Sequence, residues 1–224
     1  MKKLLLSVML VGAALCASAQ DGSVRFGIKA GATFPNVSVS EDFGLKFKTN
    51  TSFYAGATVD IPVSDMFSVQ PGLTFMGKGF KLDESVSDED GNVLGSVSAK
   101  ANLFYIEVPV NILVNIPVGE NKVFLGAGPY YGMGITGTTK VKGIVGDESV
   151  SESEDIEFGD DGEFKRADYG INFLAGYQLF NGFNIHAGYG LGLADINAET
   201  DPESDEVVAK IKNRVISVGI GFSF

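Results

Sequence analysis

The chain has a single histidine, His186, and histidine is the side chain best suited to acid–base catalysis near neutral pH. His186 alternates in phase with Asn184 along an apolar segment, so both side chains fall on the same face. A nucleophilic site would also require a serine and an acid beside the histidine. We interpret His186 as a hydrogen-bonded structural residue and expect no catalytic residues. One histidine and one cysteine, Cys16, also argue against a transition-metal site.

The segment Gly132-Met133-Gly134-Ile135-Thr136-Gly137 matches the spacing of a dinucleotide-binding loop. That chemistry needs a strand before the glycines and a helix that starts at the last one. Here the glycines alternate along an apolar run that continues into an acidic region. We therefore expect no nucleotide and no other cofactor.

Eight segments alternate between apolar and small or polar residues, which is the pattern of strands with two different faces. They are Val24–Phe34, Phe53–Val63, Phe67–Phe80, Phe104–Val114, Val123–Ile135, Tyr169–Leu179, Phe183–Leu193 and Asn213–Phe224. The face opposite the apolar one is rich in glycine, which suits the narrow interior of a small barrel better than a solvated surface. The sequence thus predicts an all-β protein, an eight-stranded antiparallel up-and-down transmembrane β-barrel, and a soluble barrel is the alternative.

Both ends of the chain suggest the compartment. Lys2 and Lys3 precede an apolar run, and Ala17-Ser18-Ala19 has the form of a signal-peptidase site, so we expect residues 1–19 to be a removed secretory signal. Residues 20–224 then form one barrel domain without cysteine. Phe222 and Phe224 end the chain in a pattern similar to the terminal signal that outer-membrane barrels present to the insertion machinery. The sequence predicts a bacterial outer-membrane protein that is a monomer surrounded by outer-membrane lipid.

The connections between the predicted strands alternate between short turns and long polar segments. The long ones are Pro35–Thr51, Lys81–Ala99, Gly137–Ala167 and Asp195–Lys212, and we expect them to be free extracellular loops. This orientation puts both termini in the periplasm and His186 far from the outer leaflet, where a lipid-modifying enzyme would need it. A net charge of −11 argues against nucleic acid as a partner.

Four charged residues fall on the predicted lumen face: Arg25, Lys29, Asp60 and Glu107. An eight-stranded barrel has an interior just wide enough for side chains, so opposite charges there should pair and fill it. We expect a polar network in which Lys29 lies near Glu107 and Arg25 near Asp60. A small-solute pore is the alternative.

Acidic clusters such as Asp88–Asn92 and Asp160–Glu163 offer oxygen ligands, but they lack the ligand spacing of a calcium loop. Solvated loop charge is the simpler interpretation. Weak bridging of divalent cations to lipopolysaccharide headgroups is the alternative.

The segments Gly27–Gly31, Phe104–Val110 and Gly126–Tyr130, together with the closing phenylalanine, resemble the PorT-like outer-membrane β-barrel family of Bacteroidota. The resemblance covers nearly the whole mature chain, and its motifs are specific for the fold rather than for an activity. It implies an outer-membrane location and, through some members, a link to protein secretion. It supplies no catalytic residue for any position of this chain.

The sequence therefore favours a non-enzymatic outer-membrane barrel that anchors acidic extracellular loops and presents them to a protein partner, a glycan or another envelope component. An accessory role in secretion, a small-solute pore and a lipid-modifying enzyme are the alternatives. A pore would show single-channel conductance, and an enzyme would need a reactive polar pair near the outer leaflet.

Overall fold

The computed structural model describes residues 24–40, 47–87, 93–145, 148–159, 162–198 and 209–224. The expected signal peptide, residues 1–19, lies outside this part of the chain. So do the acidic cluster Asp88–Asn92 and the acidic residues between 199 and 206.

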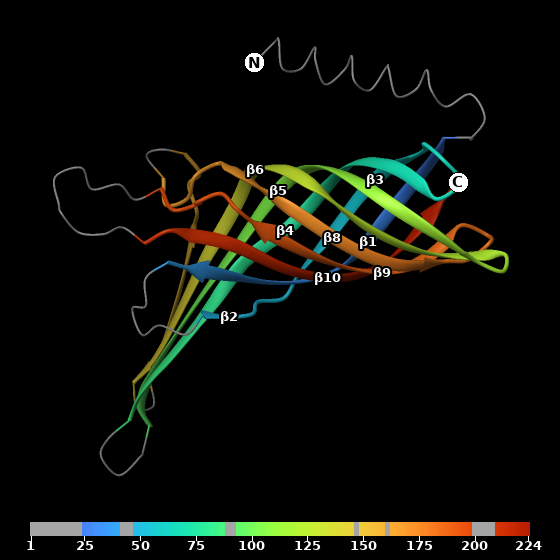
Figure 1. Ribbon diagram of the computed structural model, residues 1–224. Helices are drawn as coiled ribbons and strands as arrows, with labels where there is room; N and C mark the ends of the chain where they lie inside the picture. The colour runs from blue at the N-terminus through green and yellow to red at the C-terminus, as the bar shows by residue number, and fades with distance from the viewer. Residues whose placement is uncertain (1–23, 41–46, 88–92, 146–147, 160–161, 199–208) are drawn as a thin grey trace.

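Eight strands pair edge to edge in a closed antiparallel ring, in the order β1, β3, β4, β5, β6, β8, β9, β10 and back to β1 (Figure 1). Their bounds are β1 (Arg25–Val39), β3 (Ser52–Pro62), β4 (Phe67–Ser87), β5 (Val93–Val118), β6 (Asn121–Val145), β8 (Ala167–Gln178), β9 (Phe183–Gly192) and β10 (Ile211–Ser223). Each predicted segment corresponds to one of these strands, and the eight-stranded up-and-down barrel is confirmed. We call the end that holds Arg25 and Phe224 the terminal end, and the opposite end the loop end.

The turns at the terminal end are short because the flanking strands stay paired almost to the turn. Val118 pairs with Asn121, which leaves Gly119 and Glu120 as a two-residue connection in which Gly119 has a φ of 62°. Glycine suits this left-handed conformation because it has no Cβ. Pro117 and Val118 still belong to β5, so the turn is confined to Gly119 and Glu120.

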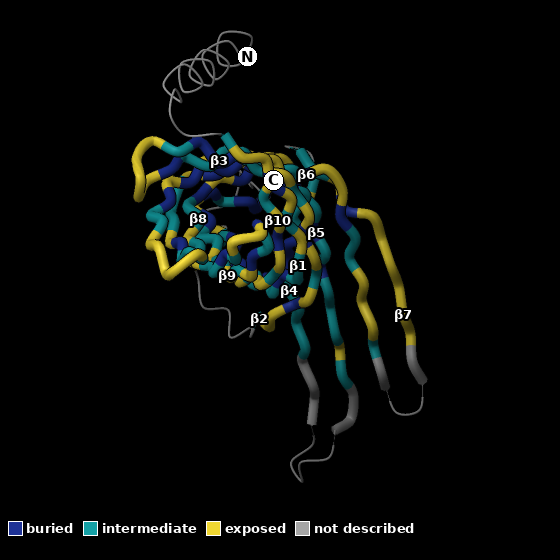
Figure 2. Tube along the Cα trace, turned by 90° about the vertical axis from the view of Figure 1, so that its right-hand side faces the viewer, coloured by how far each residue is buried: buried dark blue, intermediate teal, exposed yellow. Residues whose placement is uncertain are grey.

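Three strands run far beyond the ring at the loop end, which is the main difference from the sequence prediction. β4 and β5 form a hairpin that stays paired to Ser87 and Val93, and β6 continues into a hairpin with β7 (Glu148–Asp155). A short strand, β2 (Phe47–Lys48), pairs with β4 at Lys81 and Leu82, beyond the part of β4 that pairs with β3. Figure 2 looks along the ring from its terminal end and shows both hairpins reaching out to one side of it. Much of Lys81–Ala99 and Gly137–Ala167 is thus paired strand rather than free loop.

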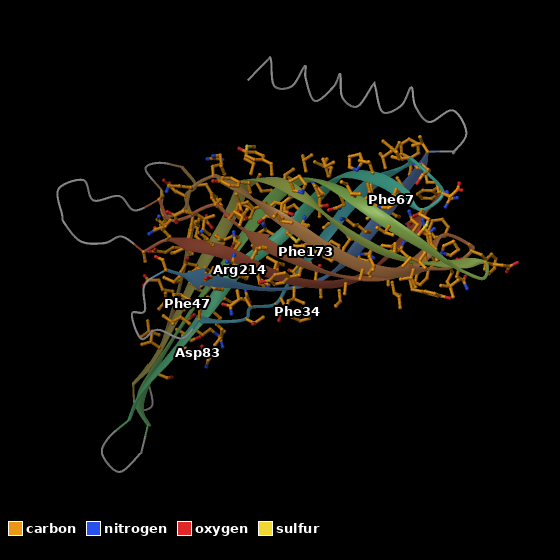
Figure 3. The ribbon with its side chains drawn as sticks, viewed as in Figure 1. Phe34, Phe47, Phe67, Asp83, Phe173 and Arg214 are labelled. Atoms are coloured by element: carbon orange, nitrogen blue, oxygen red, sulfur yellow. The ribbon has the colours of Figure 1, made fainter. Side chains whose placement is uncertain are left out.

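The apolar face of the ring points outward. Exposed side chains on this surface include Phe26, Ile28, Phe67, Leu73, Ile112, Leu125, Phe173, Ile185 and Ile220 (Figure 3). So much exposed apolar surface is expected of a wall that contacts lipid. No helix among the described residues is long and apolar enough to cross a bilayer.

The glycine-rich face lines the lumen, where glycines leave space for large side chains from other strands. A Cβ at Gly31 or Gly219 would collide with the Tyr54 ring, and one at Gly176 would collide with Phe124. Because the interior is this narrow, a few large residues fill most of its cross-section.

Candidate functional site: the lumen and its charge cluster

An ion cluster occupies the middle of the lumen. Lys78 on β4 forms ion pairs with Glu107 on the neighbouring strand β5 and with Asp168 on β8, across the ring. The Lys78 Nζ to Asp168 Oδ2 distance is 2.7 Å, and the three side chains are at most 2% exposed. Tyr130 from β6 completes this side of the cluster, since Lys78 Nζ lies 4.4 Å from the centre of its ring.

Asn213 on β10 supports the same cluster by donating a hydrogen bond from Nδ2 to Asp168 Oδ2 at 3.0 Å. The cluster therefore links strands from both halves of the ring. A buried charge is costly unless it is paired and hydrogen-bonded, so each member depends on the others. This arrangement holds a cation between two carboxylates in the middle of the lumen.

The four lumen residues predicted from the sequence lie at different heights. Glu107 belongs to the central cluster, but the cation at its carboxylate is Lys78. Lys29 interacts electrostatically with Glu107, and no hydrogen bond or ion pair of Lys29 occurs in the described part of the chain. Arg25 and Asp60 are direct cross-strand neighbours near the terminal end, where Asp60 also forms a 3.6 Å ion pair with Lys122.

Sequence reasoning missed Lys78, Asp168 and Lys122, although alternation contained a signal for each. Lys78 is in phase with Thr74, which lies directly opposite Glu107. Asp168 is in phase with Gly170, but it falls one residue before the predicted start of its strand. Lys78 lies inside the predicted strand Phe67–Phe80, and Lys122 falls one residue before the predicted start of its strand, but the prediction of lumen charges included neither residue.

His186 takes part in a separate hydrogen-bonded group. Its Nε2 lies 2.6 Å from the Tyr54 hydroxyl, and its Nδ1 lies 2.8 Å from Asn184 Oδ1. Because Asn184 Oδ1 can only accept, Nδ1 donates and Nε2 accepts from the tyrosine in the neutral ring. Both ring nitrogens are thus engaged in structural bonds, as the sequence suggested.

The loop end of the lumen is closed by an apolar cap. Its buried members are Ala101, Leu103, Tyr105, Ile156, Phe164 and Ile196. Ile156 and Phe164 come from the segment after β7, and Ile196 comes from the segment after β9. Parts of the predicted free loops Gly137–Ala167 and Asp195–Lys212 therefore pack over the barrel mouth, because they carry isolated apolar residues within polar sequence.

A cavity of about 90 Å³ lies between the ion cluster and the terminal end. Its polar lining includes Lys29, Tyr54, Asp60, Asn111, Lys122 and His186. A volume of this size has room for only a few water molecules. The lumen is therefore a small polar chamber below two layers of packed side chains.

The described residues contain no group of three or more histidine, cysteine, aspartate or glutamate side chains placed to hold a metal ion. The run from Gly132 to Gly137 lies inside β6, which continues as a strand to Val145. The strand–helix junction of a dinucleotide site is thus absent at this run.

The two terminal phenylalanines lie on the outer surface at the terminal end. Phe222 and Phe224 are 37% and 69% exposed, and their ring centres are 5.2 Å apart. Phe224 donates its backbone N–H to Phe26, so the chain end is held against β1. This placement leaves both rings accessible, and their role as an insertion signal stays a prediction.

Residues 18–198 match the family of outer membrane protein beta-barrel domains. The chain belongs to this family. The outer-membrane location and the transmembrane barrel predicted from the sequence are therefore confirmed, and a lipid environment follows from them.

Solved structures with a similar fold come from several bacteria. The attachment invasion locus protein Ail of Yersinia pestis is 15% identical, with 89% of this chain and 98% of that chain covered and a TM-score of 0.40. The outer membrane protein OprG of Pseudomonas aeruginosa is 17% identical, with coverage of 90% and 96% and a TM-score of 0.40. The outer membrane protease OmpT of Escherichia coli is 10% identical, with coverage of 92% and 98% and a TM-score of 0.43. No curated protein sequence matches the chain.

Proposed function

We propose that this protein is a non-enzymatic outer-membrane scaffold that presents its β4–β5 and β6–β7 hairpins to a partner at the cell surface. One observation carries the proposal: packed side chains fill the lumen toward the loop end, whereas the two hairpins extend well beyond the ring. The wall contacts lipid and the interior is occupied by packing. The hairpins are thus the largest surface available for recognition.

The proposed orientation places the loop end outside the cell and the termini in the periplasm. It rests on the short turns at the terminal end and the long hairpins at the other, an asymmetry typical of bacterial barrels. We also propose membership of the PorT-like barrels of Bacteroidota, on the strength of the strand motifs that resemble them.

The presented surface has an acidic edge. β7 reads Glu148-Ser-Val-Ser-Glu-Ser-Glu-Asp155, and its exposed Glu152 and Glu154 lie on the free edge of the projecting sheet. A row of acids with unpaired backbone groups beside it fits a basic protein segment or a cation-bridged glycan. Both remain within the class of partner expected from the sequence.

The test is to shorten the β6–β7 hairpin without touching the cap. Lys140 and Ser153 are direct cross-strand partners, so replacing residues 141–152 by Asn-Gly closes a two-residue hairpin at that pair. Ile156 and Phe164 are retained, because deleting them would open the barrel mouth. We expect the shortened protein to insert and to keep its heat-modifiable migration on gels, while binding to the cell-surface partner falls by at least tenfold.

A matched control exchanges Glu152 and Glu154 for glutamine in the full-length hairpin. This separates loss of the acidic edge from loss of the hairpin itself. Full surface binding by the correctly inserted, shortened protein would refute the proposal. An activity on lipid A that disappears on His186→Ala would instead support the enzyme alternative.

A further inference from the structure

Four lysines line up across four neighbouring strands where the hairpins leave the ring. Lys48 lies opposite Lys81, Lys81 opposite Lys100, and Lys100 opposite Lys140. The row therefore crosses β2, β4, β5 and β6 in register. We call these four residues the lysine row.

The lysine row is electrostatically unfavourable on its own, because like charges directly opposite each other destabilise a sheet. Asp83 reduces the repulsion between these lysines, because its Oδ2 lies 3.2 Å from Lys48 Nζ and 2.8 Å from Lys81 Nζ. Within the described residues, Lys100 and Lys140 form no hydrogen bond or ion pair. Among the described residues, Asp83 is the one carboxylate that forms ion pairs with the four aligned lysines, so the row carries an excess of positive charge that an anion from outside the chain could neutralise.

The lysine row stands on the lipid-facing side of the wall. Along β5, Lys100 is in phase with the outward-facing Phe104, whose ring packs with those of Phe53 and Phe75 at centre distances of 5.9 and 5.2 Å. This aromatic group is typical of the interfacial girdle of a membrane barrel. Lys100 is four positions further along the strand, or about 13 Å, which brings the row to the level of the lipid headgroups.

Glu152 and Glu154 of β7 lie on the opposite side of the projecting sheet, whereas Asp155, paired with Thr138, lies on the same side as Lys140. Glu152 is paired with Val141, whereas Lys140, one position away on the same strand, is paired with Ser153. Because successive side chains alternate between faces, the sheet has one basic face and one face that carries these glutamates. The basic face is the one continuous with the lipid-contacting wall.

We propose that the lysine row binds the phosphorylated headgroups of membrane lipid in the leaflet at the loop end. The hairpins extend sideways from the ring, over the space where neighbouring lipids lie (Figure 2). Lysine is a compact cation on a long flexible stem, which suits phosphate groups whose positions vary. This inference concerns the lipid-facing side of the hairpins and is independent of the partner proposed for their acidic edge.

The experiment refolds the mature protein into phosphatidylcholine vesicles that contain either bisphosphorylated lipid A or its dephosphorylated form. Lipid retained by the protein after detergent extraction is counted by native mass spectrometry at two salt concentrations. We expect the native protein to retain the bisphosphorylated lipid preferentially, and the preference to weaken as salt increases.

The test variant is Lys81→Gln/Lys100→Gln/Lys140→Gln, and the matched control replaces the same three lysines by arginine. The glutamine variant should lose roughly tenfold to hundredfold of the preference, since each surface lysine contributes about fivefold, and the arginine variant should keep it. Lys100→Gln/Lys140→Gln changes only lysines that have no partner in the described chain, so it tests the row without disturbing Asp83. Equal retention by the folded glutamine and arginine variants, or no preference for phosphorylated lipid in the native protein, would overturn the proposal.

Discussion

At the scale of single residues, the decisive position is Lys78. Its ammonium lies between two buried carboxylates, so it balances charges that would otherwise repel each other. Lys29 contributes at longer range, through its electrostatic interaction with Glu107. The two lysines should therefore differ in how strongly they couple to the same acid.

Replacing Lys78 by methionine should destabilise the barrel by about 3 to 5 kcal/mol, because Glu107 and Asp168 lose their shared cation. Neutralising all three residues together, with Glu107→Gln and Asp168→Asn, should cost less than this single change. Urea unfolding in lipid vesicles measures both free energies. The double-mutant cycle of Lys29 with Glu107 is the matched comparison and should give a smaller coupling energy. Equal coupling for both lysines would show that the central cluster is not the dominant pair.

At the scale of elements, the strands of the hairpins lack the alternation of apolar and polar residues by which strands are usually recognised in a sequence. Inside the ring one face contacts lipid and the other the lumen, so the apolar residues alternate. Beyond the ring both faces carry polar residues, such as Lys81 and Lys140 on one face and Glu152 on the other. The extensions are held by backbone pairing with neighbouring strands and by local polar contacts around Asp83.

The contribution of Asp83 to the stability of the β4–β5 hairpin should depend on pH. Its hydrogen bonds, the largest effect coming from Lys81 and the next from Ser98, hold the pKa of the Asp83 carboxyl well below its usual range. A carboxyl with a lowered folded-state pKa stabilises the hairpin fully above its unfolded pKa of about 3.9, and this contribution is lost as pH falls through the folded value.

We therefore expect Asp83→Asn to increase amide hydrogen exchange of the β4–β5 hairpin a few-fold near neutral pH. The difference from the native protein should shrink in strong acid, where Asp83 itself becomes protonated. Ser98→Ala is the control that removes one hydrogen bond while leaving the charge. A difference that persists unchanged into strong acid would contradict an ionic origin.

The sequence predicts the eight ring strands well because lipid imposes alternation on each of them. It predicts the lumen contacts poorly. The alternation of side chains along a strand tells which face a residue occupies, but not which distant residue lies across the ring. Alternation indicates the face on which Glu107 lies, whereas its contact with Lys78 depends on register and strand tilt. The cap was missed for a related reason: Ile156 and Phe164 are isolated apolar residues in polar segments, and only the closed ring provides the surface that they cover.

At the scale of the whole molecule, the lumen is asymmetric. The loop end is closed first by the cap and then by the ion cluster, and the small cavity lies on the terminal side of both. Two independent layers thus separate the polar cavity from the loop end. This arrangement favours a rigid anchor over a conduit, because a path for ions would require displacing both layers.

We expect the native protein to show no discrete conductance steps in planar lipid bilayers. A variant that thins the cap, Ile156→Gly/Phe164→Gly, should also remain closed, because Lys78, Glu107 and Asp168 still fill the lumen below it. Insertion must be verified for both proteins by flotation with vesicles and by heat-modifiable migration on gels. The absence of conductance steps then reflects a closed lumen rather than a failure to insert. Discrete steps from the native protein, with a current that changes on Lys29→Gln, would establish the pore alternative and place the ion path through the cavity.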